Sequence, residues 1–224
     1  MLTVFLPCRS GSERIKDKNT RPFVNVKGGL LEIKLNQLLR IKSVDSIILS
    51  TNDISVIKIA NKISNRIIID NRPDELALSS TSTDELIQYI PKIIDCGHVL
   101  WTHTTSPFLS EKIYEKAILK YYNNLNLNLY DSLMTVNNVQ TFLWDENGSF
   151  NYNRKVEKWP RTQTLKKLYE INSGIFINSV KNFLEYKDRI GKNPYLMNIS
   201  SINAFDIDWP DDFELAEMIY RNKK

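Results

Sequence analysis

The chain has 224 residues, of which 42% are hydrophobic and 25% are charged, and its formal net charge is +4. This length and apolar content fit one globular domain and exclude an intrinsically disordered chain. The mildly positive charge suits an anionic small-molecule ligand. Nucleic-acid-binding proteins usually concentrate more charge on one face, so we expect no nucleic-acid partner.

The chain also lacks the usual signals of export and membrane insertion. No apolar run approaches the roughly 20 residues that span a bilayer. No basic segment precedes the apolar stretch near the N-terminus, as it would in a signal peptide. Two cysteines, Cys8 and Cys96, are too few for a disulfide framework or a zinc site. We therefore expect a cytoplasmic protein with no membrane partner.

Short apolar runs alternate with helical patterns along the first 136 residues. Each of the first four runs is followed by apolar residues at helical spacing, and the third helix begins with the capping box of Ser82 and Glu85. The alternation predicts an α/β fold, a mostly parallel sheet with helices on both faces. Strands are predicted at residues 3–7, 46–51, 67–69, 98–102 and 132–136.

The pattern changes between Gln140 and Tyr152. The segments TFLW and SFNY flank DENG, which is an Asn-Gly hairpin signal. A hairpin inserted in an α/β fold is often used to pair with another chain, although a surface hairpin on a monomer fits the pattern equally well. Beyond it we predict strands at residues 174–177 and 204–207 and a last helix from about Pro210.

The first candidate site is the stretch FLPCRSGSERIKDKN, residues 5–19, which begins at the carboxyl end of the first predicted strand. Ligands of open parallel sheets bind at this end of the strands. Backbone N–H groups around Gly11 and Ser12 would suit phosphate oxygens, with Arg9 and Lys18 as flanking cations. The spacing matches neither GxxxxGK[ST] nor GxGxxG. A solvated basic loop explains the stretch about as well.

The second candidate is AFDIDWPDD, residues 204–212. In an extended strand Asp206 and Asp208 point to the same side, about 6.6 Å apart along the strand. Both carboxylates could then reach one Mg²⁺ ion, which takes one or two carboxylates plus phosphate oxygens. Helix capping explains Asp211 and Asp212, but it does not explain Asp206 inside an apolar strand. We predict that Asp206 and Asp208 are metal ligands.

Two weaker candidates lie in loops that follow strands. Arg72 precedes a Ser/Thr-rich run that leads into a capped helix, whose hydroxyls and N-terminus suit the polar edges of a base or sugar. His103 follows the strand at residues 98–102 on the same side of the sheet. Ordinary polar loops are the common alternative for both.

Taken together and in order, the blocks PCRSGSERIKDKN, STND, RPDELA followed by STST, TTSP, NSGIFI and FDIDWPDDFELAE resemble the acylneuraminate cytidylyltransferase (CMP-N-acetylneuraminic acid synthetase) family. The resemblance covers essentially the whole chain. It implies a Rossmann-like nucleotidyltransferase with one domain over residues 1–224. It also implies an inserted β-hairpin dimerisation arm at about residues 138–170, and a homodimer. The implied reaction joins CTP and an α-keto sugar acid, with Mg²⁺ as cofactor.

The resemblance also implies roles for individual residues. Four would be catalytic: Arg9 and Lys18 would hold the triphosphate, and Asp206 and Asp208 would hold Mg²⁺. The remaining nucleotide contacts would come from Ser12, Asn19, Arg72 and Thr83.

The implied substrate-binding residues are His103, Gln140, Glu170 and Asn172. His103 stands where the family has Gln, Gln140 where it has Lys, and Glu170 where it has Arg. Since such basic residues hold the sugar's carboxylate, Glu170 motivates the hypothesis of a sugar with an amino or basic substituent. Two alternatives remain: an octulosonate (Kdo-type) cytidylyltransferase, and a non-catalytic nucleotide-binding relative.

Overall fold

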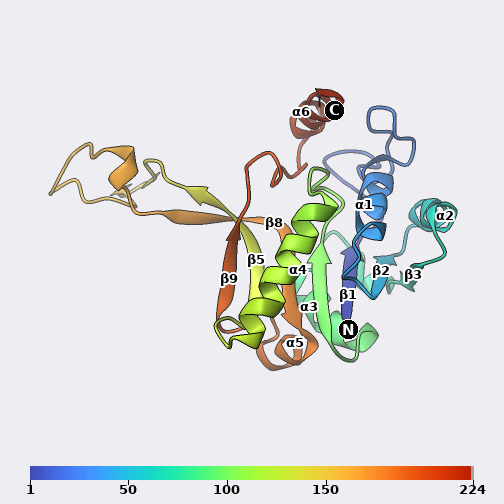
Figure 1. Ribbon diagram of the computed structural model, residues 1–224. Coiled ribbons are helices and arrows are strands. Elements are labelled where there is room, and N and C mark those ends of the chain that lie inside the picture. Colours follow the sequence, from blue (N-terminus) through green and yellow to red (C-terminus); the bar gives the residue numbers. More distant parts are fainter. Residues whose placement is uncertain (223–224) are drawn as a thin grey trace.

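One seven-stranded sheet forms the centre of the molecule. The computed structural model describes residues 1–222 (Figure 1). The strand order is β3-β2-β1-β4-β8-β5-β9, and β8 runs antiparallel to both of its neighbours while the other pairs are parallel. The predicted mostly parallel α/β fold is thus confirmed. The strands are β1 (Leu2–Pro7), β2 (Ser46–Thr51), β3 (Ile67–Asn71), β4 (His98–Thr102), β5 (Ser132–Val139), β8 (Leu168–Ser179) and β9 (Pro194–Asn198).

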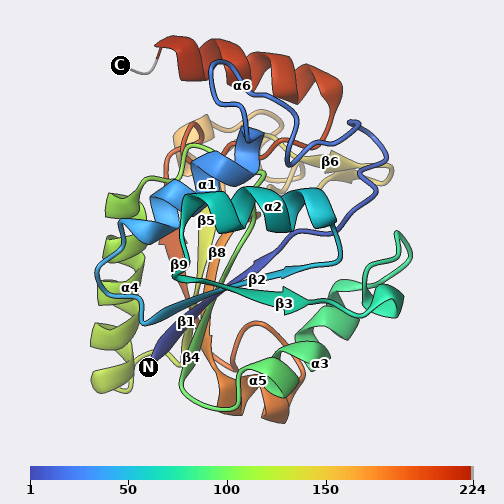
Figure 2. The same cartoon turned by 90° about the vertical axis from the view of Figure 1, so that its right-hand side faces the viewer.

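Helices cover both faces of the sheet (Figure 2). On one face lie α1 (Gly29–Leu39), α2 (Ile54–Ile63) and α4 (Glu111–Asn126); on the other lie α3 (Thr83–Ile93) and α5 (Val180–Tyr186). The predicted capping box of Ser82 and Glu85 is present at the start of α3. Among the described residues, no helix combines the length and the hydropathy needed to cross a bilayer.

A third apolar cluster lies above the ends of the strands. The last helix, α6 (Pro210–Asn222), packs Phe213 and Ala216 against the segment that follows β1, including Phe23 and Leu30. Figure 2 shows α6 across the top of the molecule, over α1. Asp212 accepts hydrogen bonds from the backbone N–H groups of Asp208 and Trp209, so its predicted capping role is confirmed.

The predicted strand at residues 204–207 is wrong. This segment joins no sheet, and the Ile207 N–H instead donates a 3.0 Å hydrogen bond to the Thr105 carbonyl in the loop after β4. The sheet edge beside β5 is already occupied by β9, which the sequence pattern did not reveal. With that edge filled, residues 204–207 pass over the strand ends towards α6.

An arm projects from the body between β5 and β8 (Figure 1). It contains β6 (Trp144–Asp145) and β7 (Gly148–Ser149), which pair as the predicted hairpin, and the short 3₁₀ helix η2 (Thr162–Thr164). A second 3₁₀ helix, η1 (Asp74–Leu76), follows β3. Trp144 and Trp159 remain 54% and 64% exposed, with Arg154 over both rings. The arm therefore carries aromatic surface that the other residues of the described range 1–222 do not cover.

Candidate functional site

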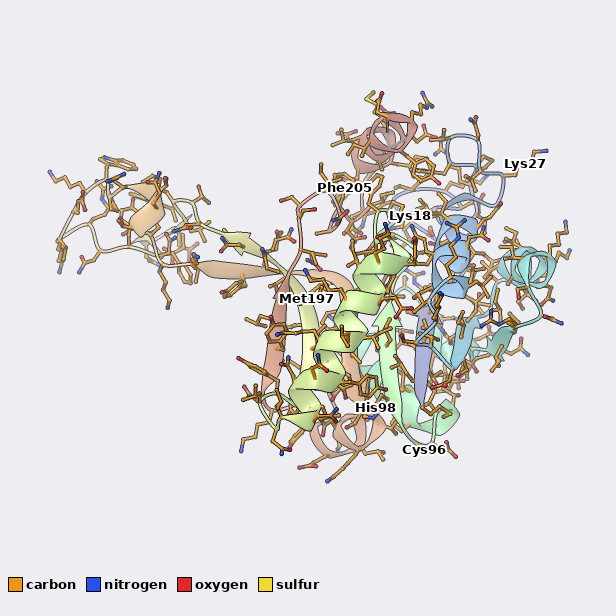
Figure 3. All side chains as sticks on the ribbon, viewed as in Figure 1. Lys18, Lys27, Cys96, His98, Met197 and Phe205 are labelled. Carbon is orange, nitrogen blue, oxygen red and sulfur yellow. The ribbon has the colours of Figure 1, made fainter. Side chains whose placement is uncertain are left out.

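A cavity of about 350 Å³ lies at the carboxyl end of β1, and we call it the β1 cavity. Figure 3 shows Lys18 at this upper end of the sheet and His98 at the opposite end. Six of the residues singled out from the sequence line the cavity, although they come from three distant parts of the chain: Arg9, Ser12, Lys18, Asn19, His103 and Asp208.

Lys18 joins the opening loop to the segment before α6. Its Nζ donates a 2.8 Å hydrogen bond to the Ile207 carbonyl and lies 3.6 Å from Oδ1 of Asp208. Arg14 Nη1 lies 3.1 Å from the same Asp208 oxygen. Two cations of one loop thus converge on a single exposed carboxylate.

Arg9 bends back over its own loop. Its Nη1 donates to the carbonyls of Ser10 and Gly11, at 3.1 and 2.9 Å. Gly11 has a φ of +71°, a conformation that favours glycine, and this lets the loop turn beneath the guanidinium. The positive charge is therefore held at the mouth of the β1 cavity without an acidic partner among the described residues.

Asp206 lies beside the β1 cavity and is the acidic group best suited to a cation. Its carboxylate accepts a hydrogen bond from Thr105, yet its Oδ1 is buried with no hydrogen-bond partner in the described chain. Burial is the main cause that raises the pKa of Asp206, and the Asp208 charge raises it further, while Lys18 opposes the shift. A carboxylate with an unmatched buried oxygen fits a bound cation.

Asp206 and Asp208 alone would supply only part of the coordination shell of a metal ion. Within residues 1–222, no group of three or more His, Cys, Asp or Glu side chains is placed to hold a metal ion. A cation at Asp206 and Asp208 would therefore complete its coordination with ligands from a substrate or from water, as is usual for Mg²⁺.

The loop after β4 is hydrogen-bonded both to the loop after β1 and to the segment before α6. Thr104 Oγ1 donates a 2.6 Å hydrogen bond to Oδ1 of Asn19, and the Thr105 carbonyl accepts the bond from Ile207 N–H. These contacts place three strand-end segments around one space. They explain how residues far apart in sequence hold a common geometry.

Lys34 supports this loop from below, and sequence reasoning missed it. The side chain is fully buried in α1, and its Nζ donates to the Ser106 carbonyl at 2.8 Å and to the Tyr114 hydroxyl at 2.7 Å. The Tyr114 hydroxyl also shares a 2.8 Å hydrogen bond with Thr102, which in turn donates to the Gly174 carbonyl. Burial lowers the pKa of Lys34 to about 7, with Asp206 opposing the shift.

His103 is held as a neutral imidazole. Trp101 Nε1, which can only donate, donates to His103 Nε2 at 3.0 Å, so the ring proton resides on Nδ1. Burial lowers the pKa of His103 to about 3, and the nearby charges of Arg189, Lys34, Lys18 and Arg72 lower it too. At neutral pH, His103 offers the β1 cavity an N–H donor and no charge.

Arg72 and Thr83 are placed differently from the residues that line the cavity. Arg72 is 4% exposed and donates from Nε and Nη2 to the side chain and carbonyl of Ser50, at 3.0 and 2.7 Å. Burial is the main cause that lowers its pKa. Thr83 is exposed as the first residue of α3, and the member of this loop that lines the β1 cavity is Ser79.

Gln140, Glu170 and Asn172 lie towards the arm and do not line the β1 cavity. Asn172 is buried, and its Oδ1 accepts a 2.7 Å hydrogen bond from Thr135. Glu170 is exposed, with Asn137 Nδ2 3.4 Å away, while Gln140 donates to a backbone carbonyl within the arm at 3.0 Å. In a single chain these residues are therefore separate from the cavity.

Several residues of the site carried a weak signal in the sequence. Lys34 stands on the apolar face of its helix, between Leu31 and Leu38, where a charge requires a partner. Arg14 was visible in the basic loop. Thr104 and Thr105 belong to the block TTSP that contributes to the family resemblance, but their roles appear only when the fold brings them to the cavity.

Comparison with known proteins identifies relatives of the whole chain. A protein of Campylobacter coli, named post-translational flagellin modification protein B, is 24% identical over 223 residues, which cover 96% of this chain and 93% of that protein. A solved CMP:2-keto-3-deoxy-manno-octonic acid synthetase, complexed with CTP, has a TM-score of 0.69 at 12% identity and covers 100% of this chain and 99% of its own.

A second solved structure, 4-diphosphocytidyl-2C-methyl-D-erythritol synthase from Anaerococcus prevotii, has a TM-score of 0.67 at 18% identity, with 98% of this chain and 96% of that chain covered. At these identities the structures are evidence of a shared nucleotidyltransferase fold. The model of the cytidylyltransferase family matches residues 3–224. Because this match spans nearly the whole sequence, the chain belongs to the cytidylyltransferase family.

Proposed function

We propose that this protein transfers CMP from CTP to a sialic-acid-like α-keto sugar acid and releases pyrophosphate. The observation that carries the proposal is the convergence in one cavity of the cationic loop after β1 and the segment that bears Asp206 and Asp208. A triphosphate needs cations around its oxygens, and a cytidylyltransferase must neutralise the charge of the leaving pyrophosphate.

Arg9 and Lys18 are the side chains proposed to bind the triphosphate. Arg9 Nη1 donates hydrogen bonds to two carbonyls of its own loop, and the remaining N–H donors of the guanidinium are available to phosphate oxygens. Ser12 and Asn19 line the same cavity and would contact the phosphates or the ribose. Arg72, which is held by β2, would face the cytidine together with Thr83 at the start of α3.

Asp206 and Asp208 are the residues proposed to hold Mg²⁺. The unpartnered buried Oδ1 of Asp206 supports this assignment. When bound, the ion would neutralise phosphate charge, and phosphate oxygens and water would complete its coordination. Lys18 and Arg14 both lie within ion-pair distance of Asp208 and would hold this carboxylate in place.

The proposed reaction is a displacement at the α-phosphorus. The anomeric hydroxyl oxygen of the sugar acid forms the new bond, and the bond to the oxygen between the α- and β-phosphates breaks. Pyrophosphate leaves with that electron pair, and the hydroxyl proton passes to solvent. Arg9 and Lys18 offset the charge that develops on the leaving pyrophosphate. The neutral His103 would donate a hydrogen bond from Nδ1 to the bound substrate.

We also propose a homodimer in which the arm reaches the partner's cavity. Gln140, Glu170 and Asn172 lie towards an arm that projects from the body, away from their own β1 cavity. Trp144 and Trp159 are exposed on that arm, and such apolar surface is typical of protein interfaces. Light scattering of the purified protein tests this, because a monomer at micromolar concentration would contradict it.

Three observations bear on the identity of the sugar acid and favour different candidates. The Campylobacter relative is named for post-translational flagellin modification, which fits a CMP-sugar that supplies a group for attachment to a protein. The second candidate is an octulosonate, because a solved CMP-octulosonate synthetase shares the fold over the whole chain. Glu170 supports the narrower hypothesis of an amino-substituted sugar.

One experiment tests the proposed reaction directly. The protein is mixed with CTP, Mg²⁺ and a panel of eight- and nine-carbon α-keto sugar acids, and CMP-sugar and pyrophosphate are measured by mass spectrometry. We expect product with a nine-carbon acid. Absence of CMP-sugar with every acid would refute the proposal, and product with the eight-carbon acid alone would favour the octulosonate alternative.

A further inference from the structure

Arg189, in the loop between α5 and β9, reaches back over the face of the sheet that α3 and α5 cover. Its guanidinium carbon lies 3.8 Å from the centre of the Phe176 ring and 5.7 Å from the centre of the Trp101 ring. These two aromatic residues are paired neighbours on β8 and β4. The guanidinium is therefore anchored by ring contacts at a defined place on the sheet.

The donors of Arg189 have no acceptor in the described chain. Among residues 1–222, the side chain forms neither a hydrogen bond nor an ion pair. Asp84 and Asp188 influence it only through longer-range attraction, and burial lowers its pKa. A cation over a ring uses the ring's face, which leaves the five N–H donors of the guanidinium without partners. A half-buried cation whose donors lack acceptors favours a bound anion.

Arg189 stands next to a residue of the β1 cavity. Trp101 lies beneath it and donates its Nε1–H to His103, with the two ring centres 6.0 Å apart. Among the charged groups that act on His103, Arg189 has the largest effect. Since His103 lines the β1 cavity, the unpartnered guanidinium is linked to the cavity wall through the Trp101 ring.

We propose that Arg189 binds the carboxylate of the sugar acid and thereby selects acids over uncharged sugars. The planar guanidinium presents paired N–H donors that match the two oxygens of a carboxylate. Gln140 and Glu170 cannot supply this positive charge. This inference rests on the proposed function, because it names the group that would recognise the acid end of that substrate.

The test compares Arg189→Gln and Arg189→Lys with wild type, and Lys181→Gln serves as the control. Lys181 is an exposed cation on α5, so its loss removes the same charge nearby without touching the rings. Steady-state KM values are measured for CTP, for the sugar acid that the panel identifies, and for the carboxamide of the same sugar. Thermal unfolding shows that each variant is folded.

We expect Arg189→Gln to raise the KM of the sugar acid by about 10- to 100-fold, the usual effect of losing a hydrogen bond to a charged group. The KM of CTP stays within about twofold of wild type, which is small on the same free-energy scale. The preference for the acid over the carboxamide collapses, Arg189→Lys restores part of it, and Lys181→Gln behaves as wild type.

Two results would overturn the inference while the proposed function stands: an unchanged KM for the sugar acid in folded Arg189→Gln, or an equal rise in the KM of CTP. If the wild-type protein makes no CMP-sugar from any acid, the proposed function itself fails.

Discussion

Lys18 Nζ lies 3.6 Å from Asp208 Oδ1 and at the same time donates a 2.8 Å hydrogen bond to the Ile207 carbonyl. One residue comes from the loop after the first strand and the other from the segment before the last helix. The Asp208 side chain is 53% exposed, so solvent screens this ion pair and it adds little to stability. Its importance lies in bringing a cation and a carboxylate to one cavity.

Asp208→Ala should abolish most of the pyrophosphate release while CTP still binds. The variant removes one proposed Mg²⁺ ligand and leaves Arg9 and Lys18 in place, so we expect a loss of about 100-fold or more in kcat. Pyrophosphate release and calorimetric CTP binding are measured in parallel. Asp211→Ala is the matched control, because Asp211 is an exposed acid in the first turn of α6.

An Asp208→Ala variant that is as active as wild type would contradict the assignment of this carboxylate. A wild-type protein that binds CTP and releases no pyrophosphate with any acid would instead favour the non-catalytic relative.

Lys34→Met should destabilise the fold and loosen the loop after β4. The change leaves the Ser106 carbonyl without its buried donor and removes a partner of Tyr114, which costs about 1–3 kcal/mol in the free energy of unfolding. Urea unfolding followed by circular dichroism measures the loss. Lys58→Met, an exposed change on α2, should have little effect. Equal stability of Lys34→Met and wild type would show that the buried hydrogen bonds contribute nothing net.

His103 should remain neutral across the physiological range. Its pKa is lowered from 6.5 to about 3, so the unfolded chain binds a proton here that the folded chain does not. The free energy of unfolding therefore falls as the pH is lowered from about 6.5 towards 3. NMR of the two histidines should show no titration of His103 between pH 8 and pH 5, and His103→Gln should make the acid destabilisation shallower. An NMR titration of His103 with a midpoint near pH 6.5 would contradict the buried position of its imidazole ring.

The two thiols should differ in reactivity. Burial raises the pKa of Cys8 to about 12, whereas Cys96 is exposed. A thiol reagent at pH 8 should therefore modify one cysteine per native chain and both in urea. Cys96→Ser should remove the native reaction, and rapid labelling of Cys8 in the folded protein would contradict its burial beside the β1 cavity.

Local sequence patterns determined much of this protein. The apolar runs at residues 46–51 and 98–102 are strands with the predicted bounds, because buried parallel strands need continuous apolar residues. The capping box of Ser82 and Glu85 formed as expected, since it depends only on neighbours along the chain. The basic loop after β1 was found for the same reason, because Gly11 and the flanking cations mark it locally.

Tertiary structure decided which distant residues meet. Residues 204–207 have the sequence pattern of a strand, yet β9 occupies the sheet edge that they would need. Which of two segments of one chain takes that edge cannot be read from the sequence of either segment alone. Lys34 beneath Ser106 and Arg189 over Phe176 likewise depend on how elements pack. Periodicity and caps are local and can be read from the sequence. The partner of a buried charge is set by contacts between residues far apart in the chain, which the fold alone brings together.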